Sequence, residues 1–206
     1  MAFTPSDGPG ISGSQALRRL VEGNRRFVRG DARFPTVQKK VLSQLAREQR
    51  PYATILGCSD SRVPPELLFD AGFGELFVIR VAGNVLSDDV AGSMQYAGVH
   101  LKTPLFVVLG HEGCGAVSAA VETHFHKVQH RSRISKLVSK IVPAIRKLNQ
   151  NLAPDLLLSQ GIEANVRWTM KQLRSSPEGK ARVKEGRLSL VGAIYQIKTG
   201  RVRFLA

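Results

Sequence analysis

Three side chains able to bind a transition metal stand at two points of this sequence. Cys58 and Cys114 are its only cysteines, and His111 precedes Cys114 in a His-x-x-Cys spacing. Two thiolates and one imidazole suit Zn²⁺, which prefers tetrahedral nitrogen and sulfur ligation. Three protein donors leave a fourth position for water, as in a catalytic zinc site. A thioredoxin-like redox pair is disfavoured because the chain has no Cys-x-x-Cys.

The elements around these residues are expected to bring them to one edge of a sheet. Apolar runs at 53–57, 76–81 and 105–109 are too short for helices and lack alternation, so they predict buried parallel strands. Cys58 follows the first run and His111 follows the third, where loops leave the carboxyl ends of the strands. Taken singly, each residue would be read as part of the core. Together at equivalent strand ends, they favour a shared metal ion.

The remaining segments complete an α/β fold, a mainly parallel β-sheet flanked by helices. An apolar stripe predicts a helix over 17–28, capped by Ser14 and stopped by Gly30. Further helices are expected over 37–46, after Ser87, from Ala116, through 127–147 with a kink at Pro143, and over 156–173, and strands over 188–197 and 201–205. The prediction is a single domain over 1–206, with an N-terminal helical arm over 1–50 and a zinc-binding α/β core over 51–206.

Composition and charge narrow the class of protein. The chain has 30 Lys and Arg against 16 Asp and Glu, a formal net charge of +14 and a pI near 10.5. Its densest basic stretch, 127–147, has apolar residues at near-helical spacing, so it is read as a solvated helix face and no nucleic-acid partner is expected. Few cysteines and no apolar run of membrane length predict a soluble, cytoplasmic protein that does not contact membranes.

Four segments together resemble the β-class carbonic anhydrases. CSDSRVPPE at 58–66 and GHEGCG at 110–115 are similar to the family's two signatures, and the likeness extends through FVIRVAGN at 77–84 and SMQYAGVHLKTP at 93–104. The resemblance implies one Zn²⁺ per chain, held by Cys58, His111 and Cys114. It also implies the reversible hydration of carbon dioxide to bicarbonate and a proton, by attack of a zinc-bound hydroxide.

The same resemblance implies a catalytic pair beside the metal. Asp60 is expected to accept the hydrogen bond of the hydroxide, and the guanidinium fork of Arg62 is expected to hold that carboxylate. In the family the aspartate can instead swing onto zinc in an inactive closed state, so Asp60 is also a candidate metal ligand. Two thiolates donate more charge than imidazoles do, and activity that rises on the alkaline side is therefore expected.

Five further residues are candidate substrate contacts by the same resemblance. Gln49 matches a glutamine whose amide would donate a hydrogen bond to a substrate oxygen. Phe77, Ala82 and Tyr96 match positions that line an apolar pocket for carbon dioxide, and Gly115 allows close approach of the backbone. Part of that wall comes from a neighbouring protomer in the family. The resemblance therefore implies a homodimer or homotetramer, with the N-terminal arm embracing a partner and with activity that requires dimerisation.

Two other features concern inhibition and proton transfer. The branch of the family that bicarbonate inhibits at a second site carries a tryptophan three residues before the first cysteine, whereas this chain has Ile55. Arg80 and Tyr195 resemble other members of that pocket, which is expected to be incomplete, so cooperative inactivation by bicarbonate is not expected. Histidines at 124, 126 and 130 are read as helix surface rather than as a proton relay.

Three alternatives stay open at this point. A zinc hydroxide attacks carbonyl sulfide and carbon disulfide by the same geometry, so a hydrolase of these molecules is the nearest enzymatic alternative. The basic chain could instead bind nucleic acid around a structural zinc, although such a site would need four protein ligands and no Asp60–Arg62 pair. A degenerate scaffold is the third, but none of the expected site residues is missing.

Overall fold

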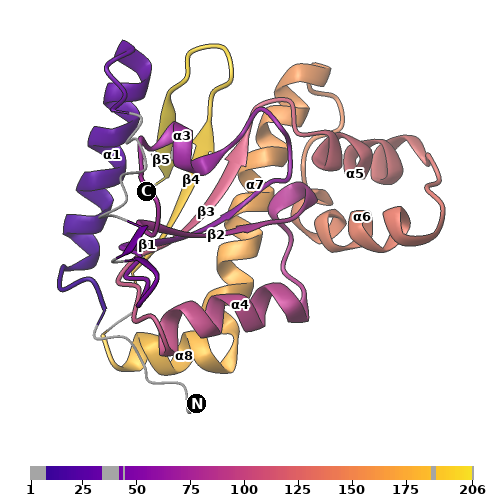
Figure 1. Cartoon of the computed structure of the whole chain (residues 1–206). Helices are drawn as coiled ribbons and strands as arrows, with labels where there is room; N and C mark the ends of the chain where they lie inside the picture. Colours follow the sequence, from indigo (N-terminus) through magenta and orange to yellow (C-terminus); the bar gives the residue numbers. More distant parts are fainter. Residues whose placement is uncertain (1–7, 34–41, 44, 187–188, 206) are drawn as a thin grey trace.

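A five-stranded sheet in the order β2-β1-β3-β4-β5 forms the centre of the protein (Figure 1). The computed structural model describes residues 8–33, 42–43, 45–186 and 189–205. The strands are β1 (Ala53–Gly57), β2 (Leu76–Arg80), β3 (Phe106–His111), β4 (Leu190–Tyr195) and β5 (Val202–Leu205). The three pairings among β2, β1, β3 and β4 are parallel, and β5 runs antiparallel to β4. The predicted mainly parallel α/β fold is confirmed.

The central strands carry the apolar runs that the sequence places there. All five residues of β1 and all six of β3 are buried, because each strand has a neighbour on both sides and helices on both faces. Successive side chains point to opposite faces. Ile55 accordingly packs in one core layer and Leu56 in the other. β2 lies at one edge of the sheet, and its residues are partly exposed.

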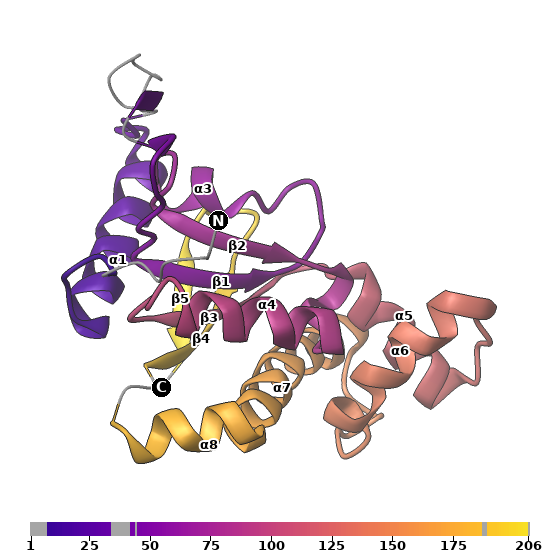
Figure 2. The same cartoon turned by 60° about the horizontal axis from the view of Figure 1, so that its bottom comes forward.

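Helices cover the two faces unequally. On one face α1 (Gly13–Arg29) buries Ala16 and Leu20 against the sheet. The other face is covered by α4 (Asp88–Val99), α5 (Gly115–His126), α6 (Ser132–Ile145) and α7 (Pro154–Ser175). Figures 1 and 2 show α5 and α6 projecting at the end of the molecule away from α1. α7 packs against the central strand β3, where Val166 and Ile162 lie beside Gly110.

Several predicted boundaries need correction. The cap of α1 is Ser12 and not Ser14, because Ser12 and Gln15 form a reciprocal capping box in which the Gln15 N–H donates to Ser12 Oγ (3.2 Å) and the Ser12 N–H to Gln15 Oε1 (2.7 Å). The predicted stop at Gly30 is confirmed, since this residue has a φ of 75°. β3 begins one residue later than predicted and runs on to His111, so this residue belongs to the strand.

Three short elements were not predicted. They are α3 (Pro65–Leu68), the 3₁₀ turn η1 (Ala82–Asn84) and α8 (Pro177–Lys184). α6 contains Pro143 and ends two residues later. The helix predicted over 37–46 falls largely outside the described residues, as does Leu188 at the start of a predicted strand.

Within the described ranges, none of the helices combines the length and apolar character that crossing a bilayer requires.

Candidate metal centre

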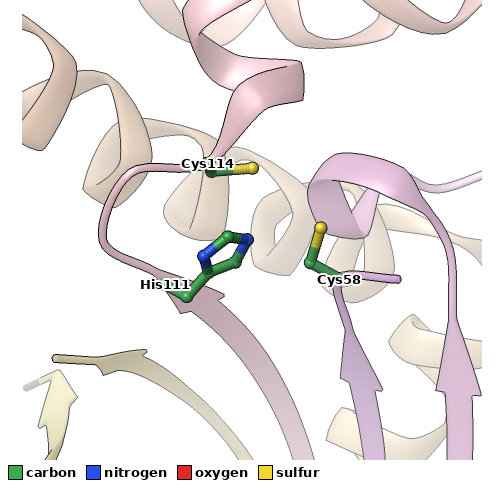
Figure 3. Close-up of side chains that lie close together, drawn as sticks. All are labelled: Cys58, His111 and Cys114. Carbon is green, nitrogen blue, oxygen red and sulfur yellow. The ribbon is translucent and has the colours of Figure 1, made fainter. Parts of the chain in front are cut away.

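The carboxyl edge of the sheet brings together the three predicted donors. Cys58 directly follows β1, His111 is the last residue of β3, and Cys114 is the N-cap of α5. Figure 3 shows their side chains converging from these three elements. One donor atom of each lies within 4.8 Å of the others, and all three residues are buried. Zinc with Zn–S bonds of about 2.3 Å would separate its two sulfurs by about 3.8 Å, so small movements would suffice to bind one ion.

The imidazole of His111 is oriented for metal binding. Its Nδ1 lies 2.9 Å from the Glu112 carbonyl oxygen, which can only accept, so Nδ1 carries the proton and donates it. Nε2 then presents a lone pair, and this buried atom has no hydrogen-bond partner among the described residues. A buried polar atom without a partner is costly. A metal ion at Nε2 would remove that cost, and the hydrogen bond at Nδ1 is the usual support of a histidine ligand.

The two neighbouring thiols shift each other's pKa in opposite directions. The Cys114 thiol and the Gly83 N–H lower the pKa of Cys58, whereas the Cys58 sulfur and burial raise the pKa of Cys114. The first-turn N–H groups of α5 at Ala116 and Val117 act in the opposite direction on Cys114 and favour its thiolate. Metal ligation releases thiol protons because only the thiolate binds. The donor set fits zinc in number, type and charge.

Asp60 stands beside the three donors and is held by Arg62. Arg62 Nε donates to Asp60 Oδ1 (2.9 Å) and Arg62 Nη2 to Oδ2 (2.7 Å), which is a bidentate pair. The hydrogen bonds from Arg62 hold the pKa of Asp60 well below its usual range. Asp60 Oδ2 also lies 4.0 Å from His111 Nε2, so the carboxylate borders the donor cluster. In this structure the Asp60 carboxylate is therefore paired with the Arg62 guanidinium.

Two contacts at the Cys58 loop were not predicted from the sequence. Arg80, the last residue of β2, donates from Nε to the Cys58 carbonyl oxygen (3.0 Å) and from Nη2 to the Asp60 carbonyl oxygen. The Gly83 N–H donates to Cys58 Sγ (3.3 Å). Arg80 pairs with Gly57 across the parallel strands. A charged residue at the end of a strand that borders the Cys58 strand was the available signal for the first contact, whereas a backbone donor such as Gly83 leaves none.

The predicted substrate contacts are only partly gathered in one chain. Phe77 and Tyr96 are partly buried and lie against each other, with ring centroids 6.1 Å apart, on the side of the edge strand β2. Ala82 opens the turn that contains Gly83. Gly115 begins α5 beside Cys114, and a Cβ there would meet nothing within 4 Å, so local crowding does not require glycine.

Gln49 lies apart from the donors of its own chain. It is exposed and precedes the amino end of β1, whereas Cys58 follows the carboxyl end. The five residues of β1 alone span about 17 Å. The arrangement within one chain therefore does not bring Gln49 to the metal ligands.

The features considered for inhibition and proton transfer lie away from the donors or serve other contacts. Ile55 and Tyr195 are buried in the core layer beneath α1, and burial raises the pKa of Tyr195. Arg80 is directed to the backbone oxygens of the Cys58 loop. α5 ends at His126, roughly 18 Å along the helix from Cys114, where this side chain is exposed. The histidines there are too far away to exchange protons with the donor cluster directly.

Comparison with known proteins gives one consistent result. The family model for carbonic anhydrase matches residues 53–202. The chain is 35% identical over 195 residues to carbonic anhydrase 2 of Mycobacterium tuberculosis, covering 94% of this chain and 93% of that one. It is 36% identical over 190 residues to the carbonic anhydrase of Mycolicibacterium smegmatis, covering 91% and 90%. Among solved structures, the β-carbonic anhydrase CcaA superposes with a TM-score of 0.75 at 30% identity, covering 92% of this chain and 95% of that one. The Coccomyxa β-carbonic anhydrase in complex with acetazolamide superposes with a TM-score of 0.73 at 30% identity, covering 92% and 86%.

Proposed function

This chain belongs to the β-class carbonic anhydrase family, and from that premise we propose that it catalyses the reversible hydration of carbon dioxide at one zinc ion held by Cys58, His111 and Cys114. The observation that carries the proposal is the convergence of two sulfurs and a ring nitrogen of His111 within 4.8 Å, together with a buried Nε2 that has no hydrogen-bond partner in the described part of the chain. Two sulfurs and one nitrogen support zinc over harder cations, which prefer oxygen ligands. Zinc bound there would lower the pKa of a water ligand and so supply a hydroxide nucleophile.

Asp60 and Arg62 would orient the nucleophile. Ionised Asp60 can only accept hydrogen bonds, so it would select the lone pair that faces the substrate carbon by accepting the O–H hydrogen. Arg62 would keep the carboxylate in that position, because a bidentate pair fixes both oxygens. The pair is part of an open loop, with Arg62 54% exposed and Asp60 18% exposed. This exposure supports an exit for the proton and bicarbonate.

We further propose that the substrate pocket is completed by a second copy of the chain. Phe77 of the edge strand β2 and Tyr96 of α4 form a partly exposed aromatic pair, and a dry pocket for carbon dioxide would need them covered. Gln49 lies beyond the opposite end of β1, where it could serve the site of a neighbour rather than its own. A homodimer is the smallest assembly that would satisfy both, and a homotetramer of such dimers would also do so. The N-terminal region over 1–50, which includes α1, would then contact the partner.

A complementation experiment tests the shared pocket. Gln49→Ala and Cys58→Ser would each lower hydration activity as separate preparations. Mixed dimers would regain one intact site only if Gln49 acts on the neighbouring chain, because the Gln49→Ala chain keeps its metal ligands and receives Gln49 from the Cys58→Ser chain. Restored activity is the expected result after refolding the two together. Activity that stays at the sum of the separate variants, or a fully active monomer in sedimentation, would contradict the shared pocket.

Zinc content and substrate preference test the function itself. We expect one zinc per chain and hydration of carbon dioxide well above turnover of carbonyl sulfide or carbon disulfide, measured side by side. Turnover confined to the sulfur compounds would make the protein a hydrolase of those molecules. Bound zinc without any turnover, together with salt-sensitive binding of DNA or RNA, would indicate a structural zinc in a nucleic-acid-binding protein.

We propose a cytoplasmic location. Both cysteines are free and face a common metal site, and retaining them as thiols favours a reducing compartment.

A further inference from the structure

Two buried polar side chains of α7 hold a turn that is distant in sequence. Asn165 Nδ2 donates to the Gly83 carbonyl oxygen (2.8 Å), and Thr169 Oγ1 donates to the Asn84 carbonyl oxygen (3.2 Å). Asn165 and Thr169 are each 1% exposed. They are four residues apart, so they lie on one face of the helix. Their neighbours on α7 that enter the same core are apolar, among them Ile162 and Val166.

The turn has two buried carbonyl groups that need donors from another part of the chain. Gly83 has a φ of 67° and Asn84 a φ of 43°, and both residues are buried. Glycine and asparagine are the residue types that enter this left-handed region most readily, so the conformation itself suits the sequence. The Asn84 N–H is held by the Val81 carbonyl oxygen (2.9 Å), which leaves the two carbonyl groups that α7 satisfies. Without Asn165 and Thr169, both oxygens would be buried without those donors, and the turn would have reason to rearrange.

The other side of this turn faces the metal site. The Gly83 N–H donates to Cys58 Sγ (3.3 Å), and this contact is buried. Asn165 and Thr169 fix the carbonyl oxygens of Gly83 and Asn84. The backbone conformation of Gly83, and with it the direction of its N–H, is therefore set by these two hydrogen bonds. A continuous set of hydrogen bonds thus runs from α7 through the turn to one of the three donors.

We propose that Asn165 and Thr169 are positioning residues for Cys58, acting through the Gly83–Asn84 turn to aim the Gly83 N–H at the sulfur. The inference rests on the proposed function, since it takes Cys58 to be a metal ligand. An N–H donor to the sulfur fixes the side-chain rotamer of Cys58 and disperses negative charge on the thiolate. Loss of either α7 side chain should therefore loosen the metal and not only the fold.

Zinc release to a chelator tests this directly on the zinc-loaded protein. Thr169→Val removes the hydroxyl at nearly constant volume, and Asn165→Leu removes the amide. Loss of a supporting contact commonly lowers metal affinity by about 10- to 100-fold, so we expect zinc release to accelerate by about tenfold or more in each variant. Thr169→Ser keeps the hydroxyl and should release zinc at the parental rate. The Gly83 amide resonance in ¹H–¹⁵N spectra should shift in the first two variants and stay in place in the third.

Thr103→Val is the matched control. Thr103 is also 1% exposed, and its hydroxyl contacts the Ala97 carbonyl oxygen (3.3 Å) and Thr54 Oγ1 (2.8 Å) at the opposite end of the sheet. It should lose stability like Thr169→Val but release zinc within about twofold of the parent, the scatter expected for independent sites.

Release that is unchanged in the α7 variants, or equally accelerated in Thr103→Val, would overturn the proposal. If Asn165→Leu does not fold, Thr169→Val and Thr169→Ser decide the matter. A parent protein that holds zinc without hydrating carbon dioxide would defeat the proposed function while leaving this comparison decisive. If the parent binds no zinc, the proposed function fails. The Gly83 amide resonance of the metal-free variants then decides whether the α7 side chains determine the orientation of the Gly83 N–H, and an unmoved resonance would overturn the proposal.

Discussion

Replacing Gly83 by alanine should destabilise the protein through two separable effects. The first is backbone strain, because the φ of 67° costs an L-residue about 1–2 kcal/mol. The second is crowding, because an added Cβ would lie 2.8 Å from Ile141 Cδ1 and 3.0 Å from Ala116 Cβ. Overpacking of a dense core costs about 1–3 kcal/mol. We therefore expect the free energy of unfolding to fall by about 2–5 kcal/mol, measured by urea denaturation at saturating zinc and fixed protein concentration.

Two companion variants separate the strain from the crowding. Gly30→Ala has a comparable φ of 75° but meets nothing within 4 Å, so it should show only the strain of about 1–2 kcal/mol. Ile141→Val deletes the Cδ1 atom that the new Cβ would meet. Alone it should cost about 0.5–1.5 kcal/mol, but combined with Gly83→Ala it should cost less than the sum by about 1 kcal/mol. Equal losses for the two glycine variants, together with strict additivity of the pair, would refute the crowding argument.

Three further outcomes are expected. Asp60→Asn should lower kcat/KM by about a hundredfold at unchanged zinc content, since an amide does not reproduce the charged acceptor. The control Asp31→Asn changes a carboxylate in an exposed pair with an arginine and should leave kcat/KM unchanged. Equal effects of the two variants in hydration assays would contradict the role of Asp60. A hydrogen bond from Arg203, joined by those from Arg167, lowers the pKa of Glu163, so this carboxylate contributes stability above the ordinary carboxyl pKa. That stability is lost as pH falls through the folded pKa. Glu163→Gln should therefore flatten the acid limb of the plot of urea midpoint against pH, and an unchanged limb would count against the prediction. This chain has Ile55 where the bicarbonate-inhibited branch has a tryptophan, so we expect activity to change with pH without cooperativity, both with and without added bicarbonate. A sigmoidal pH dependence that added bicarbonate makes steeper would contradict this prediction.

The sheet and the metal donors were predictable because their signals are local. Short apolar runs without alternation identify β1 and β3, and the order of these runs along the chain implies parallel pairing. Residues at or just after the ends of such strands must then meet at the carboxyl edge, which brings Cys58 toward His111, the last residue of β3. The choice of zinc stays a proposal, which is based on the donor types, since two thiols and an imidazole suit few other metals.

The supporting contacts were not predictable because they depend on tertiary packing. Asn165 reads in the sequence as one polar residue within an amphipathic helix, and nothing near it indicates a bond to a residue 82 positions away. The Ser12 cap was missed because Ser14 is an equally good capping type, and only the reciprocal bonds with Gln15 distinguish them. Gln49 shows a further limit, since the role proposed for it on a neighbouring chain leaves no signal in the sequence of where it acts.

Stopped-flow hydration of carbon dioxide by the zinc-loaded protein, from neutral to alkaline pH, tests the central claim most directly. Cys58→Ser is the control, because it removes one donor of the cluster at nearly constant size. Turnover that rises with pH in the parent and is lost in Cys58→Ser together with zinc is the expected result. A parent that binds one zinc per chain but hydrates carbon dioxide only at the uncatalysed rate at every pH would contradict it.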